Sequence, residues 1–397
     1  MQTRFHAPPN PRRTRARHGF LAVLAALTLA VTAVPATASA ASTPASGPGE
    51  LLGFAPSALH PLPGQWTNTR AWKIEYRSTT ADGHPDTVSG TVIVPQDGRT
   101  APRPLITYAV GTVGLADSCA PSANFPRGTA LEANLIQKLT QRGWAVAVTD
   151  YEGLGTPGDH TYTVGRSAGR AMLDAARAAQ QLPEAGLSAD GPVGIMGYSQ
   201  GGQAASWAAE LHGSYAPELK VKGTAAGGVP ADLMRVAASN DGSYGSGLIF
   251  MAAAGQDAAF PELDLDSYLN PAGRVLVDYF RTHCVAVDAA LGSFKRISDL
   301  TTRNPLEQPD WQLRLDGSTL GRTAPDHPVY QYHALADELI PYGVGRQLRN
   351  DWCARGATVN WSTVWIGEHV SGAITEANRA GDWLADRFAG RTVRGNC

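Results

Sequence analysis

Charged residues, cysteines and long apolar runs are all scarce in this chain of 397 residues. Asp, Glu, Lys and Arg make up 17%, against roughly 25% in an average soluble protein, whereas hydrophobic residues make up 43%. This composition excludes intrinsic disorder for most of the chain and can supply a large core. No H-E-x-x-H and no phosphate-binding Gly-Lys-Ser motif occurs, so metalloprotease and nucleoside-triphosphatase functions lack support.

The formal net charge of −2 hides a difference between residues 1–40 and the rest of the chain. Five of the 33 basic residues and none of the 35 acidic residues lie in 1–40, which leaves 28 basic and 35 acidic residues in the remainder. That excess of negative charge offers no basic surface to the phosphates of nucleic acids or anionic lipids. We therefore expect no nucleic-acid partner.

The N-terminal segment resembles an export signal. The largely apolar run 20–34 has 15 residues, fewer than the roughly 20 that span a bilayer. Arg12 and Arg13 precede it, and the small-residue segment 35–40 follows. Basic, apolar and small regions in this order predict a secretory signal peptide over 1–40 and a secreted, extracellular protein, with a membrane anchor as the alternative. Residues 41–65 are predicted to form a leader.

Only four cysteines lie in the exported part of the chain: Cys119, Cys284, Cys353 and Cys397. An even number in an oxidising compartment indicates two disulfides, and three pairings are open from the sequence. None of the spacings is a C-x-x-C pair, so we expect no metal site.

Short apolar segments alternate with segments of helical periodicity along most of the chain. This rhythm predicts an α/β fold, a mostly parallel central sheet with helices on both faces and a hairpin at its antiparallel edge. The interval 229–325 interrupts the rhythm and is interpreted as a helical insertion between a first core part, 66–228, and a second, 326–397. The expected strands are 72–76, 87–94, 104–110, 144–148, 192–196, 221–227, 329–333 and 359–365, and the main helices of the core are 131–141, 167–181, 201–211 and 371–388.

A G-x-S-x-G motif follows the buried strand 192–196 and opens a helix. It reads Gly197-Tyr-Ser199-Gln-Gly201. A nucleophilic serine on such a sharp strand-to-helix turn needs small neighbours, and the helix that follows directs its first N–H groups toward developing negative charge. The motif therefore predicts Ser199 as a nucleophile, and a purely structural turn is the alternative.

A serine hydroxyl is a weak nucleophile without a base, and the base needs a carboxylate to orient it. In folds with this motif the residues follow the order Ser, Asp or Glu, His. His369 lies between the last strand and the last helix, and Asp337 follows the strand 329–333. We predict a catalytic triad of Ser199, Asp337 and His369. Glu338 is the competing acid, and structural roles are expected for His327 and His333.

Two backbone N–H groups should bind the oxyanion of the tetrahedral intermediate. The first belongs to Gln200, the residue after the nucleophile. The second is assigned to Thr112, in the glycine-bearing loop after the strand 104–110, with Gly111 as the alternative. The segment 153–158 matches G-x-G-x-x-G, but Pro157 and a polar run separate it from the next helix, so nucleotide binding is not expected.

Several motifs together make the chain similar to the secreted lipases related to Candida antarctica lipase A, within the α/β-hydrolase superfamily. The resemblance implies the same triad, pairs Cys119 with Cys284 and Cys353 with Cys397, and makes the helical insertion a lid. The motifs, in the order of the family, are 117–122 (DSCAPS), 150–155 (DYEGLG), 197–202 (GYSQGG), 214–218 (SYAPE), 227–230 (GGVP), 336–342 (ADELIPY) and 368–369 (EH).

The predicted function is that of a secreted serine carboxylic-ester hydrolase, in first place a triacylglycerol lipase, working through an acyl-enzyme without a cofactor or metal. The apolar segment 247–253 either forms a surface for acyl chains or a lipid interface, or packs the insertion onto the sheet. A secreted esterase acting on short-chain or acetyl esters is the nearest alternative. A peptidase and a non-catalytic cell-wall-binding protein are weaker ones, and we expect a monomer.

Overall fold

A computed structural model describes residues 47–397. The predicted signal peptide, 1–40, and the first part of the predicted leader lie outside the described residues. Within the described part of the chain, no helix combines the length and the apolar character needed to cross a membrane.

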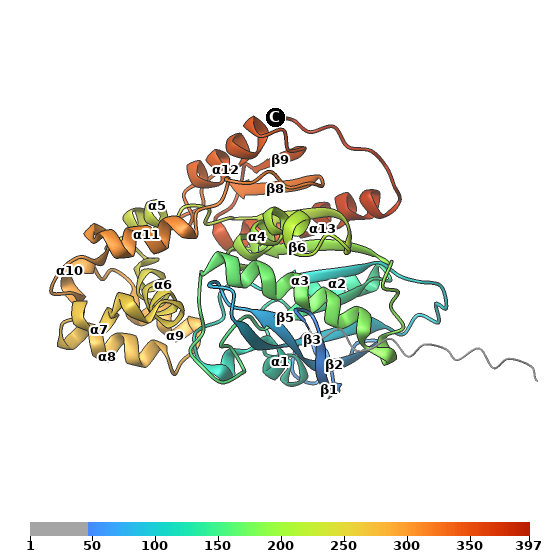
Figure 1. The fold of residues 1–397 in the computed structure, drawn as a ribbon, viewed down its shortest axis with the longest axis horizontal. Coiled ribbons are helices and arrows are strands. Elements are labelled where there is room, and N and C mark those ends of the chain that lie inside the picture. The colour runs from blue at the N-terminus through green and yellow to red at the C-terminus, as the bar shows by residue number, and fades with distance from the viewer. Residues whose placement is uncertain (1–46) are drawn as a thin grey trace, which may run out of the picture. The chain divides into compact units, whose positions relative to one another are not determined.

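A nine-stranded mixed sheet forms the centre of the fold, in the order β1-β2-β3-β5-β4-β6-β7-β8-β9 (Figure 1). Strands β4 to β9 run parallel, and β1, β2 and β3 add an antiparallel edge next to β5. The strands are β1 (Leu51–Ser57), β2 (Thr69–Thr79), β3 (Pro85–Pro95), β4 (Leu105–Ala109), β5 (Ala145–Thr149), β6 (Pro192–Tyr198), β7 (Lys220–Gly227), β8 (Val329–Ala334) and β9 (Val359–Val364).

Helices cover both faces of this sheet. One face packs against α3 and α4, and the other against α2 and α13. The helices of the core are α1 (Pro121–Asn124), α2 (Ala133–Gln141), α3 (Gly165–Gln181), α4 (Gln200–Tyr215), α12 (Tyr342–Ala354) and α13 (His369–Phe388). The predicted α/β-hydrolase fold, with its parallel strands and covering helices, is confirmed.

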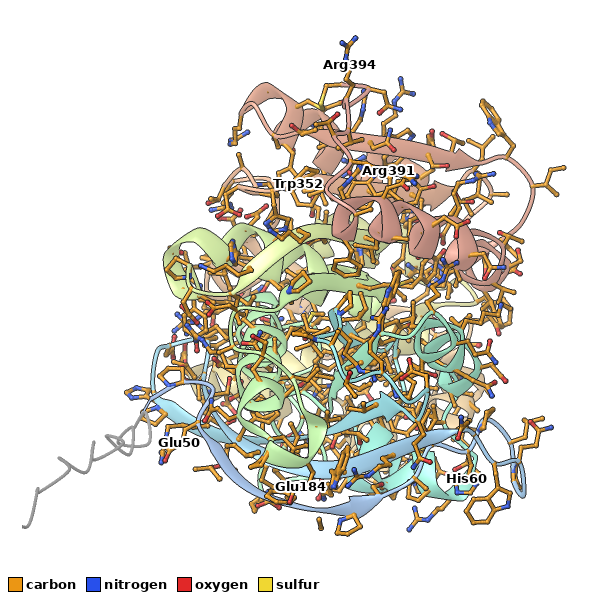
Figure 2. All side chains as sticks on the ribbon, turned by 90° about the vertical axis from the view of Figure 1, so that its right-hand side faces the viewer. Glu50, His60, Glu184, Trp352, Arg391 and Arg394 are labelled. Atoms are coloured by element: carbon orange, nitrogen blue, oxygen red, sulfur yellow. A yellow bond between two sulfur atoms is a disulfide. The ribbon has the colours of Figure 1, made fainter. Side chains whose placement is uncertain are left out.

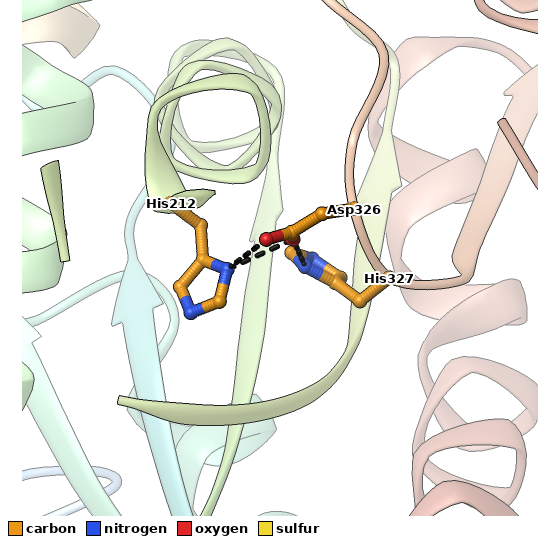
Figure 3. Close-up of side chains that lie close together, drawn as sticks. All are labelled: His212, Asp326 and His327. Atoms are coloured by element: carbon orange, nitrogen blue, oxygen red, sulfur yellow. Dashed lines mark hydrogen bonds and ion pairs between the residues drawn. The ribbon is translucent and has the colours of Figure 1, made fainter. Parts of the chain in front are cut away.

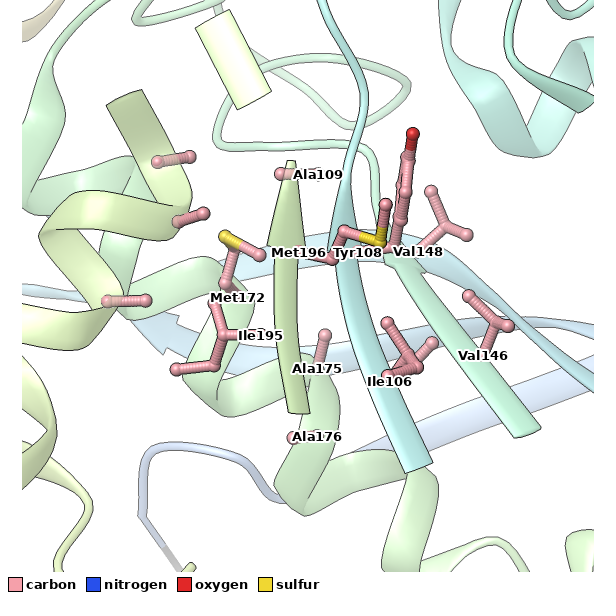
Figure 4. Close-up of a cluster of buried hydrophobic side chains, with 14 of the residues drawn as sticks. Ile106, Tyr108, Ala109, Val146, Val148, Met172, Ala175, Ala176, Ile195 and Met196 are labelled. Carbon is pink, nitrogen blue, oxygen red and sulfur yellow. The ribbon is translucent and has the colours of Figure 1, made fainter. Parts of the chain in front are cut away.

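The central strands are apolar on both faces because helices bury them from both sides. All five residues of β4 and all five of β5 are buried. Figure 4 shows Ile106 of β4, Val146 of β5 and Ile195 of β6 in this layer, with Met172 of α3 beside them. The loops that leave the carboxyl ends of these strands therefore start from a rigid platform.

The prediction of a leader over 41–65 needs a correction. Strand β1 lies inside this range and pairs with β2 along the outer edge of the sheet. The hairpin β2–β3 is present as predicted, but it is not the outermost element. Strand β1 escaped prediction because six of its seven residues are apolar or glycine without the alternation of a half-buried strand, and four of the seven are exposed.

Seven helices occupy the chain between β7 and β8, and they appear in yellow and orange on one side of the sheet in Figure 1. Most of them, though not the first helix and not the one after Cys284, contribute to a second hydrophobic core built around the buried Met251, Phe280 and Trp311. They are α5 (Leu233–Asn240), α6 (Ser246–Ala259), α7 (Leu265–Tyr268), α8 (Pro271–Phe280), α9 (Val285–Gly292), α10 (Ile297–Leu300) and α11 (Pro309–Gly317).

Two disulfides are present, Cys119–Cys284 and Cys353–Cys397, and they are the pairs that the family resemblance implies. The first joins the loop after β4 to the residue before α9. The second ties the C-terminal residue to α12, beside Trp352. Figure 2 shows Trp352 inside the fold and Arg394 at its outer edge.

Candidate active site

Ser199 occupies the turn between β6 and α4, in a backbone conformation that few side chains adopt, with φ of 60°. The two glycines of the motif make this turn possible. A Cβ on Gly197 would lie 2.1 Å from the carbonyl oxygen of Gly201, and a Cβ on Gly201 would lie 2.0 Å from that of Ala109. Both distances are far below van der Waals contact, so any side chain here would push β6, α4 and β4 apart.

Three side chains from distant parts of the chain form a hydrogen-bonded row at the carboxyl ends of the strands. The Oγ of Ser199 lies 2.9 Å from Nε2 of His369, and Nδ1 of His369 lies 2.7 Å from Oδ2 of Asp337. His369 is the first residue of α13, and Asp337 lies in the loop after β8. The residues predicted as a triad are thus within direct contact of one another.

The carboxylate of Asp337 is held by four donors. Oδ1 accepts from the backbone N–H groups of Leu339 and Ile340, at 3.0 and 2.7 Å. Oδ2 accepts from His369 and lies 3.2 Å from Nε2 of His333, whose proton also faces the carbonyl oxygen of Ile340 at 2.9 Å. Burial alone would raise the pKa of Asp337, but the hydrogen bonds from the two histidines outweigh it and hold the pKa well below its usual range. Asp337 is therefore ionised at neutral pH.

Hydrogen bonds hold both the N–H and the carbonyl group of the His369 backbone. Its N–H donates to Oε2 of Glu338 at 3.0 Å, and its carbonyl accepts from the hydroxyl of Tyr198 at 2.7 Å. Glu338, the competing acid of the sequence analysis, thus contacts the backbone of His369, whereas Asp337 contacts the ring. Tyr198 was missed because a tyrosine inside the G-x-S-x-G motif carries no signal of its contact with a residue 171 positions away.

The loop after β4 lies against Ser199, and a buried glutamate determines its position. A Cβ on Gly111 would lie 3.7 Å from that of Ser199. The N–H of Gly111 donates to Oε1 of Glu132 at 2.6 Å, and Oε2 of Glu132 accepts from the hydroxyl of Tyr108 at 2.5 Å. Because its N–H is already used, Gly111 is a poor oxyanion donor. The N–H of Thr112 has no acceptor anywhere in residues 47–397.

The side chains of Thr112 and Gln200, whose N–H groups are the two predicted oxyanion donors, both form hydrogen bonds with the neighbouring segment 160–162. The hydroxyl of Thr112 lies 2.7 Å from that of Tyr162, whose pKa burial raises to about 12. The side chain of Gln200 donates from Nε2 to Nε2 of His160, at 3.1 Å. Burial lowers the pKa of His160 to about 4, so its ring is neutral and can accept this bond while Nδ1 donates to the carbonyl of Glu152.

An apolar pocket of about 910 Å³, open to solvent, begins at Ser199 and Gln200 and continues into the helical insertion. Residues of the segment 247–253 line it, as expected, but Met251 of that segment points into the second core instead. The segment therefore contributes both to the pocket wall and to the packing of the insertion. The apolar side chains of the insertion that line the pocket are Leu233, Val236, Leu248, Ile249, Phe250, Leu265, Leu269, Ile297, Leu306, Trp311 and Leu315.

Comparison with known families agrees with this architecture. The profile of the family described as secretory lipase matches residues 123–396, which is more than half of the chain. The chain belongs to the secretory lipase family. It is therefore a hydrolase of ester bonds, as the sequence predicts.

Curated relatives of this secretory lipase include secreted triacylglycerol lipases and one protein named as probably inactive. A secreted triacylglycerol lipase of Malassezia globosa is 31% identical over 82% of this chain and 72% of its own length. A protein of Mycobacterium tuberculosis named a probable inactive lipase is 32% identical, over 81% of this chain and 74% of its own. Because the family includes such a member, the geometry of the Ser199 row matters for function.

Solved structures with the same fold include Candida antarctica lipase A in its closed state. It is 24% identical, with a TM-score of 0.80 over 88% of this chain and 84% of that one. The rice cell wall degrading esterase LipA of Xanthomonas oryzae is 19% identical, with a TM-score of 0.71 over 86% of this chain and all of the other. At these identities the likeness establishes the fold of the lipase and leaves its substrate to the site itself.

Proposed function

We propose that this lipase is a secreted, extracellular enzyme that hydrolyses long-chain triacylglycerols through a triad of Ser199, His369 and Asp337. The observation that carries the proposal is the hydrogen-bonded row, with Nε2 of His369 2.9 Å from Oγ of Ser199. The row and the lining of the pocket come from one chain, so the proposed reaction requires no residue of a second copy.

In the first step, His369 removes the proton of Ser199 while Oγ attacks the ester carbonyl. The ring of His160 holds the side chain of Gln200, and the hydroxyl of Tyr162 holds that of Thr112, so the N–H groups of Gln200 and Thr112 are ready for the developing oxyanion without reorganisation. His369 then gives its proton to the departing alcohol, and water repeats the sequence on the acyl-enzyme. Asp337, ionised and buried, stabilises the imidazolium and keeps the remaining ring proton on Nδ1.

The pocket supports a long acyl chain as the preferred substrate. Its lining beyond Ser199 is almost entirely aliphatic and aromatic, so each methylene that enters it leaves water, worth about 0.8 kcal/mol. A short or acetyl ester would leave most of this surface uncovered. Longer chains are therefore expected to gain in kcat/KM until the pocket is filled.

The test is a series of p-nitrophenyl esters of increasing acyl length, together with emulsified long-chain triacylglycerol, on the purified mature protein. Wild-type kcat/KM should rise with chain length, and Ser199→Ala should lower kcat by roughly 10⁴-fold or more. Covalent labelling by a fluorophosphonate probe should occur in the wild type and be absent in Ser199→Ala.

Two results would count against the proposal in different ways. Near-normal activity of Ser199→Ala would remove the triad. A full triad response combined with a preference for acetyl or butyryl esters would leave the mechanism intact and identify the enzyme as a short-chain esterase. A preference for short esters could also arise because long chains cannot enter the pocket. Leu248→Ala tests this, because it widens the pocket and should then shift the preference toward longer esters.

A further inference from the structure

A second cluster of chemically active side chains lies at the opposite end of α4 from Ser199. It comprises His212 in the last turn of that helix and the neighbours Asp326 and His327, just before β8 (Figure 3). Nδ1 of each histidine lies 2.8 Å from Oδ1 of Asp326, and one nitrogen or oxygen of each residue lies within 4.8 Å of the others. Both rings are buried, and the aspartate is about half exposed.

The hydrogen bonds of His212 require a positive charge inside this cluster. Its Nε2 lies 2.9 Å from the carbonyl oxygen of Leu219, which only accepts, so Nε2 carries the ring proton. In the neutral ring, Nδ1 is then a lone pair, and it faces the carboxylate of Asp326 at 2.8 Å. Two lone pairs repel each other at this distance. Either a second ring proton or a cation must lie between them.

The second histidine is arranged in the same way. Nε2 of His327 lies 2.7 Å from the hydroxyl of Thr224, which can accept its proton and leave Nδ1 as a second lone pair toward Asp326. Histidines that ligate a metal almost always donate their other ring N–H to an oxygen, which fixes the tautomer and the ring orientation. Leu219 and Thr224 supply these two oxygens. Unlike the carbonyl of Leu219, the hydroxyl of Thr224 can also donate, so His327 has two possible tautomers. In the tautomer with the proton on Nε2, a metal ion can accept a lone pair from both rings and from the carboxylate at once.

We propose that His212, Asp326 and His327 bind a zinc ion. Two imidazoles and one carboxylate are typical zinc ligands, and the exposed side of Asp326 admits the ion and a water as the fourth ligand. Zinc binds such ligands at roughly 2.0–2.2 Å, so the side chains must adjust from their hydrogen-bonded positions to surround the ion. Gly213 leaves room for the carboxylate, because a Cβ there would lie 2.9 Å from Oδ2 of Asp326. The sequence did not predict this site, since its ligands are 114 residues apart.

The zinc ion has a structural role. At 1.5 Å per residue, α4 separates His212 from Ser199 by about 20 Å, too far for a part in ester hydrolysis. The site instead links the end of α4 and β7, through Thr224, to the segment that returns from the helical insertion to β8. Zinc is therefore expected to raise the melting temperature and to leave kcat unchanged.

The test uses the untagged mature protein, because a polyhistidine tag binds zinc itself, after treatment with EDTA and dialysis. Zinc is titrated by calorimetry at about pH 7.5, because zinc binding is weakened by competing protons in more acid solution, and thermal unfolding is followed with and without zinc. Wild type should bind one ion per chain and unfold at a higher temperature. Asp326→Asn, close in shape to the wild type and half exposed, should lose affinity at least about tenfold, as should His212→Gln.

His84→Gln is the matched control, because His84 is an exposed histidine in the turn between β2 and β3, away from the cluster. It should bind zinc as the wild type does. The proposal is wrong if wild type takes up no zinc, if Asp326→Asn binds as tightly as wild type, or if calcium stabilises the protein and zinc does not. In the first case the charge between His212 and Asp326 is a proton, and stability should depend on pH alone.

Discussion

Replacing Asp337 by Asn changes one atom of the row and reverses its hydrogen bonding. The amide oxygen can still accept from the N–H groups of Leu339 and Ile340, which hold Oδ1 in the wild type. The amide nitrogen then faces Nδ1 of His369, and two donors cannot bond to each other. His369 must therefore move its proton to Nε2, where no lone pair is left to receive the proton of Ser199.

The expected loss in kcat is roughly 10⁴-fold, which corresponds to about 5 kcal/mol in activation free energy. The free energy of unfolding should fall by about 2 kcal/mol, because the hydrogen bond from His369 to a buried carboxylate is lost. Kinetics on a soluble p-nitrophenyl ester measure the first effect, and urea unfolding measures the second. For the kinetic measurement, wild type and Asp337→Asn are both kept well below the urea concentration at which the variant unfolds, so that lost activity cannot result from unfolding.

Glu338→Gln is the matched control, because Glu338 is the neighbouring acid and contacts only the backbone N–H of His369. Glu338 is exposed, and the amide oxygen of Gln can still accept that bond, so kcat should change by less than about tenfold. If Glu338→Gln were inactive and Asp337→Asn kept a near-normal kcat, the assignment of Asp337 as the acid would be refuted. The tautomer argument would then be refuted as well.

Three further predictions concern stability. Gly201→Ala should lower the free energy of unfolding, measured in urea, by about 3 kcal/mol or more, because the new Cβ would collide with backbone atoms. Gly317→Ala is the control and should leave the free energy of unfolding unchanged, because nothing lies within 4 Å of its new Cβ. Equal effects of the two substitutions would contradict the close-packing argument. The double variant Cys353→Ser, Cys397→Ser opens a loop of 44 residues and should cost about 4 kcal/mol, measured by the same unfolding curves; an unchanged midpoint would show that the bond adds nothing. The pKa of Asp337 in the folded protein is below its value in the unfolded chain, so the ionised carboxylate stabilises the fold above about pH 4, and this stabilisation is lost in more acid solution. The free energy of unfolding should therefore fall more steeply with decreasing pH in wild type than in Asp337→Asn. Identical pH profiles of the two proteins would contradict this.

The parallel strands and the Ser199 turn could be predicted because their signals are local. A buried strand is a short apolar run, and the turn after β6 needs glycine two positions to either side of the serine. The order Ser, Asp, His then limited the base and the acid to few candidates, and the structure brings the predicted three into contact.

Contacts made across long stretches of chain could not be predicted. His333 was expected to be structural, and its Nε2 lies 2.9 Å from the carbonyl oxygen of Ile340, but the same nitrogen lies 3.2 Å from the carboxylate of Asp337, which nothing in its surroundings in the chain indicates. Glu132 reaches Gly111 from the residue before α2, where an acidic residue is common for reasons of helix stability alone. Edge strand β1 lacked a pattern because the sheet buries little of it.

The disulfide between Cys119 and Cys284 restricts how an ester reaches Ser199. It bonds the start of α9 to the loop after β4, and the N–H of Val285 donates to the carbonyl of Val113 at 2.9 Å beside it. The insertion is thus held at a third point, in addition to its two chain connections to β7 and β8, and this point is covalent. Reduction would leave only the two chain connections and the non-covalent contacts to position α9 over the loop after β4.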